Sequence, residues 1–172
     1  MRILKALVII LLALILIFLS IGLFLPSFDY AVSIEVKASP EKCWLTFHDT
    51  TRMSQWLPGF ESLVLKSGEP LKAGSQYEII VIDHNEKIVM SEIITKVNAP
   101  TSISYELNND VLKSEYTFSF TGDSITTTID SHYKVTGNNV MWKSILFLSK
   151  SYLESNGQEQ LAGLKKVVEM QL

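Results

Sequence analysis

A single carboxylate in this sequence, Glu92, is placed where an internal acid or base could act. It lies in the run of residues 87–97, which is apolar on both faces of an extended chain. If Met90 and Ile94 face inward, Glu92 joins them, because side chains two residues apart share one face of a strand. A carboxylate in an apolar pocket has a raised pKa, which suits an acid or base catalyst. If Ile93 faces inward instead, Glu92 lies in water, and the sequence leaves both registers open.

The histidines of this sequence do not form an obvious catalytic pair. His48 and Asp49 are adjacent at the end of an expected helix, where successive side chains point about 100° apart. We therefore interpret them as a helix cap exposed to solvent. His132 lies between Asp130 and Lys134 on the polar face of an expected strand, which indicates a solvated residue.

Metal binding and covalent catalysis find little support. Asp83, His84, Asn85 and Glu86 include metal-ligating side chains, but they lie at an expected hairpin tip, where such residues form turns. No further ligand is evident nearby, so no metal site is expected. Cys43 is the only cysteine, which excludes an intramolecular disulfide, and it has no recognisable histidine and acid partners. Without a glycine-rich phosphate loop either, the sequence implies no cofactor.

The charge balance argues against nucleic acid as a partner. The 172 residues carry a net charge of -3 and a pI of about 5.6. Binding to phosphates needs a basic stripe, and the sequence shows none.

The most hydrophobic part of the chain is an unbroken apolar stretch at residues 6–25. At about 1.5 Å per residue, roughly 20 helical residues span the ~30 Å hydrocarbon core of a bilayer. A cleaved signal peptide is the alternative. Such a peptide would have a shorter apolar core and a small-residue cleavage site, whereas this stretch continues into Pro26. We therefore predict an uncleaved signal anchor.

Two basic residues before the stretch, Arg2 and Lys5, predict the orientation of a single-pass membrane protein. Positive residues stay in the cytoplasm, which places the N-terminus there and the remainder of the chain outside the cytoplasm. The expected division is an anchor in residues 1–28 and one domain in residues 29–172, with residues 26–31 as a hinge.

The beginning of the domain predicts one strand and two short helices. Residues 32–38 alternate apolar and polar, as a half-buried strand does. Ser39 and Pro40 then offer an N-cap and a first helical residue. A second short helix is expected over residues 51–56.

Six further strands are expected next, because runs rich in β-branched and aromatic residues alternate with short turns. The expected strands cover residues 60–67, 75–83, 87–97, 102–108, 111–120 and 125–135. Connections this short predict an antiparallel meander. In the last two strands one face is apolar, with Leu112, Tyr116, Phe118 and Phe120 on the first and Ile125, Ile129, Tyr133 and Val135 on the second.

The chain is expected to close with one amphipathic helix over residues 139–169. Asn156 and Gly157 should kink this helix, because glycine destabilises a helix interior. We expect Gly157 to act as a hinge within this helix.

Four stretches carry a resemblance to a known family. They are residues 34–44 (IEVKASPEKCW), 53–60 (MSQWLPGF), 72–77 (KAGSQY) and 161–169 (LAGLKKVVE). In their order and spacing they resemble the polyketide cyclase/dehydrase-like branch of the START-like helix-grip superfamily, also called SRPBCC. The resemblance implies an α+β fold in which a curved antiparallel seven-stranded sheet wraps around a long C-terminal helix. It also implies a deep apolar cavity that binds lipids, sterols, quinones or polyketides, with no invariant catalytic residues to transfer.

Nine residues are expected to line that cavity, although the same residue types would also suit a filled core. They are Trp56, Tyr77, Met90, Tyr105, Tyr116, Phe118, Trp142, Ile145 and Leu146.

Three functions follow from these observations. The first is membrane-tethered binding or transport of a small hydrophobic ligand. The second is a cyclase, dehydratase or hydrolase that uses Glu92 on an apolar substrate. The third is a protein-interaction module with a filled core and a polar outer face that carries Lys113, Glu115, Asp130, His132 and Lys134.

Overall fold

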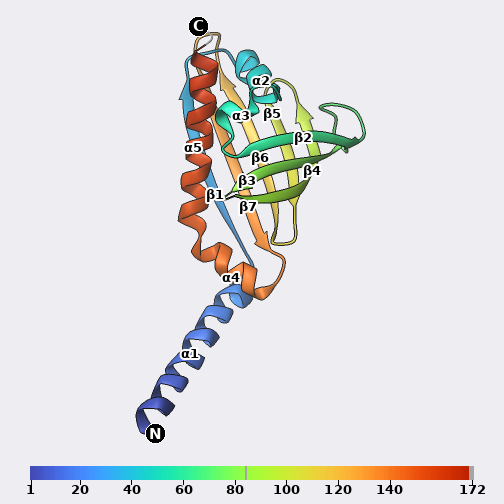
Figure 1. Ribbon diagram of the computed structural model, residues 1–172. Coiled ribbons are helices and arrows are strands. Elements are labelled where there is room, and N and C mark those ends of the chain that lie inside the picture. Colours follow the sequence, from blue (N-terminus) through green and yellow to red (C-terminus); the bar gives the residue numbers. More distant parts are fainter. Residues whose placement is uncertain (84, 171–172) are drawn as a thin grey trace.

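One antiparallel sheet is the framework of this protein, seen in a computed structural model that describes residues 1–83 and 85–170 (Figure 1). Along the chain the elements are α1 (Arg2–Phe24), β1 (Ser27–Val36), α2 (Pro40–His48), α3 (Met53–Trp56), β2 (Phe60–Ser67), β3 (Gln76–Asp83), β4 (Glu86–Asn98), β5 (Ser102–Asn108), β6 (Leu112–Gly122), β7 (Thr127–Gly137), α4 (Val140–Leu148) and α5 (Lys150–Glu169). The strands lie in the order β1-β7-β6-β5-β4-β3-β2, so β2 to β7 form a meander and β1 pairs with β7. This confirms the predicted α+β fold with seven antiparallel strands and a helical C-terminus.

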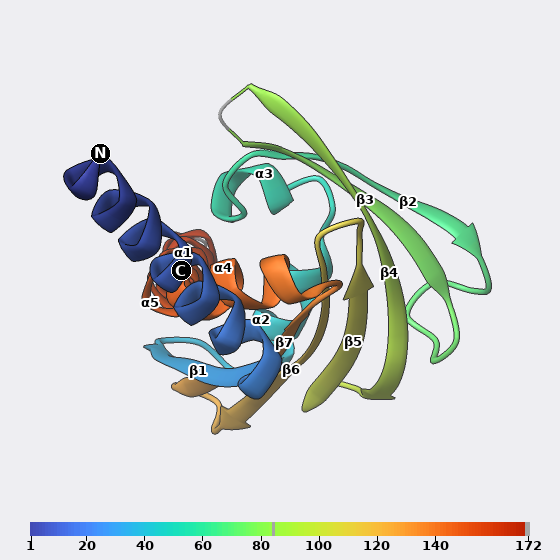
Figure 2. The ribbon, with the colours of Figure 1, turned by 90° about the horizontal axis from the view of Figure 1, so that it is seen from below.

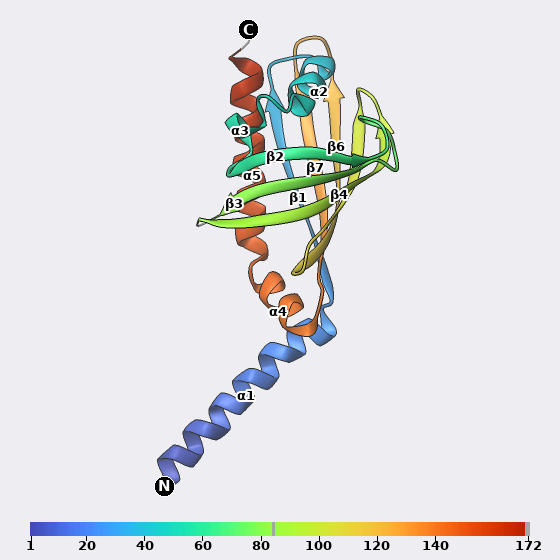
Figure 3. The same ribbon diagram turned by 45° about the vertical axis from the view of Figure 1, so that its right-hand side comes forward.

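The sheet is strongly curved. Seen from below in Figure 2, it forms a wall that bends from β1 and β7 round to β2, with the helices of the domain on its concave side. Figure 3 shows β2, β3 and β4 running across the direction of β1, β6 and β7. Irregularities in strand pairing between Phe60 and Ser62, between Leu65 and Ser67, and between Ile94 and Lys96 contribute to this bend, because a bulge increases local twist.

The start of α2 follows from its sequence as predicted. Ser39 is the N-cap with extended backbone, its Oγ accepts a hydrogen bond from the Lys42 N–H at 3.4 Å, and Pro40 is the first helical residue. The cap fixes the direction of α2, which brings Trp44 and Phe47 onto the concave face of the sheet.

Under α2 and α3 the concave face is a filled aromatic core. Phe47 is central to it, with ring centroids 5.4 Å from Trp56, 4.6 Å from Phe118 and 5.6 Å from Phe120. Leu161 and other apolar residues of α5 close this core from the side. This half of the domain therefore has the packing of an ordinary protein interior.

The prediction of a single C-terminal helix over residues 139–169 is wrong in one respect. The segment forms two helices, α4 and α5, which meet at Ser149. The Asn139 side chain caps α4 by accepting from the Trp142 N–H at 3.0 Å. From there α4 packs on β7, β1 and α1, whereas α5 packs chiefly on β1, α3 and α2. The break therefore lies where the chain changes its packing partners.

Asn156 and Gly157 lie inside the continuous helix α5, which runs straight in Figure 1, so the predicted kink is wrong. A hinge at Gly157 stays a prediction. Gly157 is buried against β1, and a Cβ at this position would lie 3.3 Å from Cγ2 of Val32. Glycine here permits close approach of the helix to the sheet.

Substitution of Gly157 tests this role. Gly157→Ala should leave stability nearly unchanged, because a gain of about 1 kcal/mol in helix propensity is opposed by the tight contact with Val32. Gly157→Leu should lower the free energy of unfolding by about 1–3 kcal/mol through overpacking. Denaturant unfolding measures both, with Ser155→Leu on the exposed side of α5 as the control. Equal effects of the two leucine substitutions would show that α5 does not lie this close to β1.

Two further details differ from expectation. The predicted hinge at residues 26–31 is mostly strand, because β1 begins at Ser27 and pairs with β7 along its whole length. Ile125 does not share the inner face of β7: it lies in the turn before the strand and is 73% exposed. In that turn the carboxylate of Asp123 accepts from the Ile125 and Thr126 N–H groups, so the strand begins at Thr127.

Candidate functional site

Four tyrosines from four adjacent strands form one row across the concave face of the sheet. The register places Tyr30 opposite Tyr133, Tyr133 opposite Tyr116, and Tyr116 opposite Tyr105. Successive rings are stacked, with centroids 4.6, 5.8 and 5.1 Å apart in that order. Cross-strand aromatic pairs stabilise a sheet by about 0.2–1 kcal/mol each. These four residues are called the tyrosine row below.

Glu92 lies beside the tyrosine row and is 7% exposed. The Tyr116 hydroxyl donates a hydrogen bond to its Oε2, with the oxygens 2.5 Å apart. Its Oε1 has no hydrogen-bond partner among the described residues and is not fully enclosed, so this oxygen meets space that water can enter. Burial raises the pKa of Glu92, and the hydrogen bond from Tyr116 offsets only part of that rise. The geometry is that of a carboxyl group that keeps its proton above the ordinary range.

The structure selects the inward register for Glu92, one of the two that the sequence leaves open. Ile94 is fully buried on the same face, whereas Val89 on the other face is exposed. Tyr77 of β3 pairs with Glu92, and Met90 pairs with the buried Ile79.

The expectation that His48 is a solvent-exposed cap is wrong. Its Nδ1 lies 2.8 Å from the Trp44 carbonyl oxygen, and its Nε2 lies 3.3 Å from the Tyr105 hydroxyl. Burial lowers the pKa of His48, which favours the neutral ring. Since Trp44, Phe47 and His48 have the i, i+3, i+4 spacing of one helix face, the sequence did contain a signal for this orientation. Asp49, by contrast, bonds Thr51 and Arg52 at the surface.

His48 should make the domain less stable in acid. Its ordinary pKa is 6.5, and the folded protein holds it lower. As the pH falls through 6.5, the unfolded chain takes up a proton before the folded protein does, so the free energy of unfolding decreases until the lowered pKa is passed. His48→Gln should remove this part of the pH dependence in denaturant titrations, with His132→Gln as the control for loss of a histidine. Identical curves for wild type and His48→Gln would place the ring in water.

The nine residues expected to line a cavity divide into two groups. Trp56, Tyr105, Phe118 and Leu146 are buried, while Tyr77, Met90, Tyr116, Trp142 and Ile145 keep part of their surface exposed. Trp56 and Phe118 belong to the filled aromatic core, and Leu146 packs in a second cluster with Phe28 and Val135. Contact of these residues with a ligand stays a prediction.

Around the tyrosine row the concave face is only partly covered. The half-buried residues on this face are Tyr30, Tyr77, Met90, Leu107, Tyr116 and Tyr133. The helices α4 and α5 pack chiefly on β7 and β1, and α2 and α3 cover the opposite end of the face. The concave face therefore has an enclosed half and an open half that keeps part of its surface exposed. Glu92 and the tyrosine row lie where the two halves meet.

The outer face of the sheet carries polar side chains over a broad hollow of about 860 Å³. Glu115, His132 and Lys134 line it, in agreement with a solvated histidine on the polar face. A smaller hollow of about 340 Å³ lies between α3 and α5.

The described residues bring no three His, Cys, Asp or Glu side chains together in the way a metal site requires. Asp83 ends β3 and Glu86 begins β4, as the predicted hairpin tip requires, while His84 lies outside the described residues.

Comparison with solved structures shows which fold the domain has. The ZhuI aromatase/cyclase from Streptomyces sp. R1128 superposes with a TM-score of 0.69 at 12% identity, covering 83% of this chain and 94% of that one. A protein from Thermus thermophilus gives 0.68 at 16% identity, covering 83% and 98%. A conserved protein from Geobacillus kaustophilus gives 0.69 at 16% identity, covering 83% and 96%. The domain thus has the helix-grip fold.

The sequence itself gives the family. Residues 27–169 match the family described as polyketide cyclase / dehydrase and lipid transport, and this chain belongs to it. No curated protein sequence matches the chain significantly.

Proposed function

We propose that this protein binds a small hydrophobic ligand that carries one hydrogen-bonding group, on the open half of the concave face. The observation that carries the proposal is the Glu92–Tyr116 pair beside the tyrosine row. Glu92 Oε1 is left without a protein partner where water can enter, and no ion pair in the described part of the chain neutralises this carboxyl group. A ligand hydroxyl or carbonyl that displaces water there would form a hydrogen bond with this carboxyl group. The tyrosine rings supply apolar surface for the rest of the ligand.

The ligand is held near a membrane in this proposal. The helix α1 is long and apolar enough to cross a bilayer and projects away from the domain (Figures 1 and 3). A tether keeps the local concentration of the domain high at the surface where sparingly soluble molecules collect. Membership of a family described by lipid transport as well as by cyclases supports the same ligand class.

Native mass spectrometry of the full chain tests the proposal. The protein is extracted from cells in a mild detergent, and the detergent is removed in the gas phase. We expect a co-purifying hydrophobic molecule on wild type, and its loss from Glu92→Leu. Glu106→Leu, which changes a carboxylate on the outer face, is the matched control. Wild type without any bound hydrophobe, or equal occupancy in all three proteins, would contradict the proposal.

A second candidate function is acid–base catalysis on such a ligand. The observation that favours it is that Glu92 is buried with a raised pKa and a hydroxyl donor, as a proton-transferring carboxyl group needs. Under this function Glu92 is the general acid or base and Tyr116 positions it. Incubation of the co-purified molecule with wild type would change its mass or double-bond pattern, and Glu92→Gln would bind it unchanged. An unaltered molecule after incubation with wild type assigns binding alone.

The orientation of the tether gives a separate prediction. With Arg2 and Lys5 on the cytoplasmic side, alkaline phosphatase fused after Leu172 should be active, and a fluorescent protein that folds only in the cytosol should stay dark. The reverse pattern would place the domain in the cytoplasm.

A further inference from the structure

The last turns of α1 are packed directly against α4. The Ser144 hydroxyl donates to the Phe18 carbonyl at 2.6 Å and accepts from the Gly22 N–H at 2.9 Å. Gly22 is buried, and a Cβ there would come within 2.1 Å of the Val140 carbonyl oxygen. Glycine at this position therefore allows the two helices to touch, and α1 meets the domain through a specific contact.

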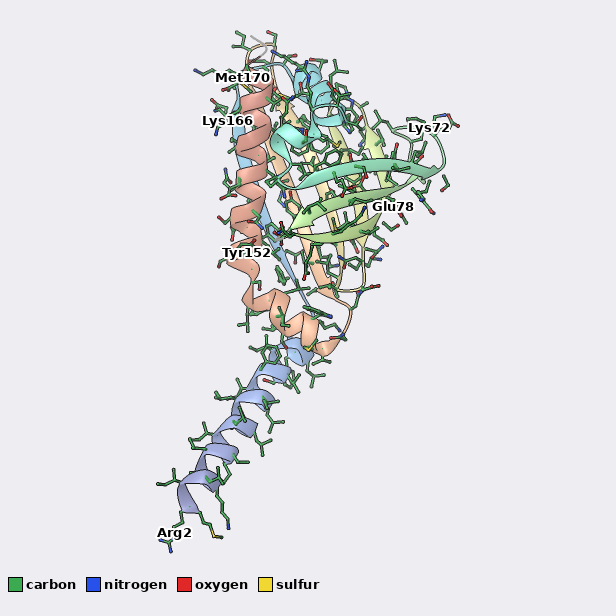
Figure 4. The ribbon with its side chains drawn as sticks, in the orientation of Figure 1. Arg2, Lys72, Glu78, Tyr152, Lys166 and Met170 are labelled. Atoms are coloured by element: carbon green, nitrogen blue, oxygen red, sulfur yellow. The ribbon has the colours of Figure 1, made fainter. Side chains whose placement is uncertain are left out.

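The position of this contact along α1 fixes the depth of α4. A helix of 23 residues is about 34 Å long, slightly more than the ~30 Å hydrocarbon core. Phe18 and Gly22 precede the end of α1 at Phe24 by roughly 9 and 3 Å along the helix axis. Arg2 lies at the far end, away from the domain (Figure 4). If α1 spans the bilayer, α4 lies at the level where the hydrocarbon core ends.

The chemistry of α4 suits that level. Its sequence is VMWKSILFL, in which Lys143 is the only charged residue. Met141 is 47% and Leu148 61% exposed, although both are large and apolar. Tyr152 follows in the first turn of α5 and is 57% exposed. Together with the exposed Phe24 these three residues are called the apolar rim, which runs from the end of α1 along α4 to the first turn of α5.

We infer that α4 and the apolar rim lie in the interfacial layer of the same bilayer that α1 crosses, so that the domain rests on the membrane surface. The inference depends on the membrane tether of the proposed function. We assign the bilayer as the partner that covers the apolar rim, because the rim is continuous with α1. Apart from the last turns of α1, no described part of the domain covers that helix. Apolar side chains beside a tryptophan and a lysine are typical of segments at the boundary between lipid and water. The ligand site then lies next to the lipid surface, since Leu146 of α4 packs in the same cluster as Tyr30 and Tyr133 of the tyrosine row.

Tryptophan fluorescence can test this position. The three tryptophans are Trp44, Trp56 and Trp142. The first two are buried residues of α2 and α3, which lie at the end of the domain away from α1 (Figure 1). The full chain is reconstituted in phosphatidylcholine vesicles whose acyl chains are brominated near the headgroup. We expect brominated lipid to quench the wild-type emission and to leave Trp142→Phe nearly unquenched. Leu148→Glu should reduce the quenching of wild type, whereas Ile125→Glu, at an exposed turn far from α4, should not.

Flotation of the same vesicles distinguishes a failure of the membrane tether from a failure of the interfacial position of α4. Protein that does not float with lipid would remove the tether from the proposed function. Protein that floats while wild type and Trp142→Phe are quenched equally would overturn the interfacial position alone. Absence of quenching together with a disulfide-linked dimer of Leu148→Cys would assign the rim to a second copy of the chain, and Cys43, which is fully buried, would not interfere.

Discussion

Replacing Glu92 with glutamine is expected to stabilise the domain at neutral and alkaline pH and to leave it unchanged in acid. Burial raises the pKa of Glu92 above its ordinary value of 4.5. Between these two values the folded protein keeps a proton that the unfolded chain releases, so the free energy of unfolding falls as the pH rises through this window. Above the raised pKa this loss of stability is complete and no longer changes with pH. Glutamine does not titrate, so the difference between Glu92→Gln and wild type should grow from pH 4.5 upward and then level off in denaturant unfolding.

Glu106→Gln is the control, because Glu106 should change the free energy of unfolding with pH in the opposite direction to Glu92. Glu106 accepts from Lys113 and Asn108 on the outer face, and these bonds lower its pKa. Its contribution to stability is present above pH 4.5 and is lost as the pH falls through the lowered pKa. Because this pair is exposed, the effect should be small. A Glu92→Gln curve that follows wild type at every pH would show that Glu92 is solvated and ionised, and would remove the acid–base function with it.

Tyr116→Phe should shift the pH dependence of the free energy of unfolding that Glu92 causes. The Tyr116 hydroxyl is the donor that lowers the pKa of Glu92, against the larger effect of burial. Without this donor the pKa rises further, so the fall in stability should extend to higher pH. Double-mutant comparison with Glu92→Gln isolates the pair, because the shift cannot occur when residue 92 does not titrate.

The parts of the fold that were predictable from the sequence are those set by local chemistry. The bounds of β2 and β5 were predicted correctly because turn residues flank each strand. The Ser39 cap was predicted correctly because it needs only a hydroxyl before a proline and an acidic first turn.

The break at Ser149 was not predictable in this way. The sequence there, LFLSKSYL, has no helix breaker, and Ser149 leaves the helical region only in ψ, with φ -90° and ψ 5°. The two helices diverge because α4 is held by α1, β7 and β1, while α5 follows β1 towards α2 and α3. The contacts of α4 with α1 and of α5 with β1 join residues more than 100 positions apart, which periodicity cannot detect.

For a similar reason, only part of the candidate site was predictable from the sequence. Glu92 was recognised, but its register was ambiguous because β4 is apolar on both faces. The tyrosine row depends on the registers of three strand pairs, and these become visible only when the sheet is assembled. At His48 the sequence carries two competing signals: the adjacent Asp49 favours a helix cap, whereas the spacing from Trp44 places the ring on the buried face of the helix.

The division of the concave face into a filled and an open half predicts very different effects of truncating two apolar side chains. Phe120 is 1% exposed and packs edge-on against Trp44 and Phe47. Phe120→Ala should lower the free energy of unfolding by about 3–5 kcal/mol, because the loss of transfer free energy and the cavity add. Met90 is half-buried on the open half, so Met90→Ala should cost less than about 2 kcal/mol, the lower end of the range for a fully buried methionine.

Ligand binding should respond in the reverse order. Folded Phe120→Ala should retain the co-purifying hydrophobe, since Phe120 packs against Trp44 and Phe47 and lies four residues along β6 from Tyr116, the partner of Glu92. Met90→Ala should lose much of it, because Met90 is the neighbour of Glu92 on the inner face of β4. Unfolding titrations and native mass spectra of the same preparations give both quantities. A large stability loss at Met90 with unchanged occupancy would mean that the concave face is filled throughout, and the polar hollow on the outer face, with Glu115, His132 and Lys134, would then be the surface on which function depends.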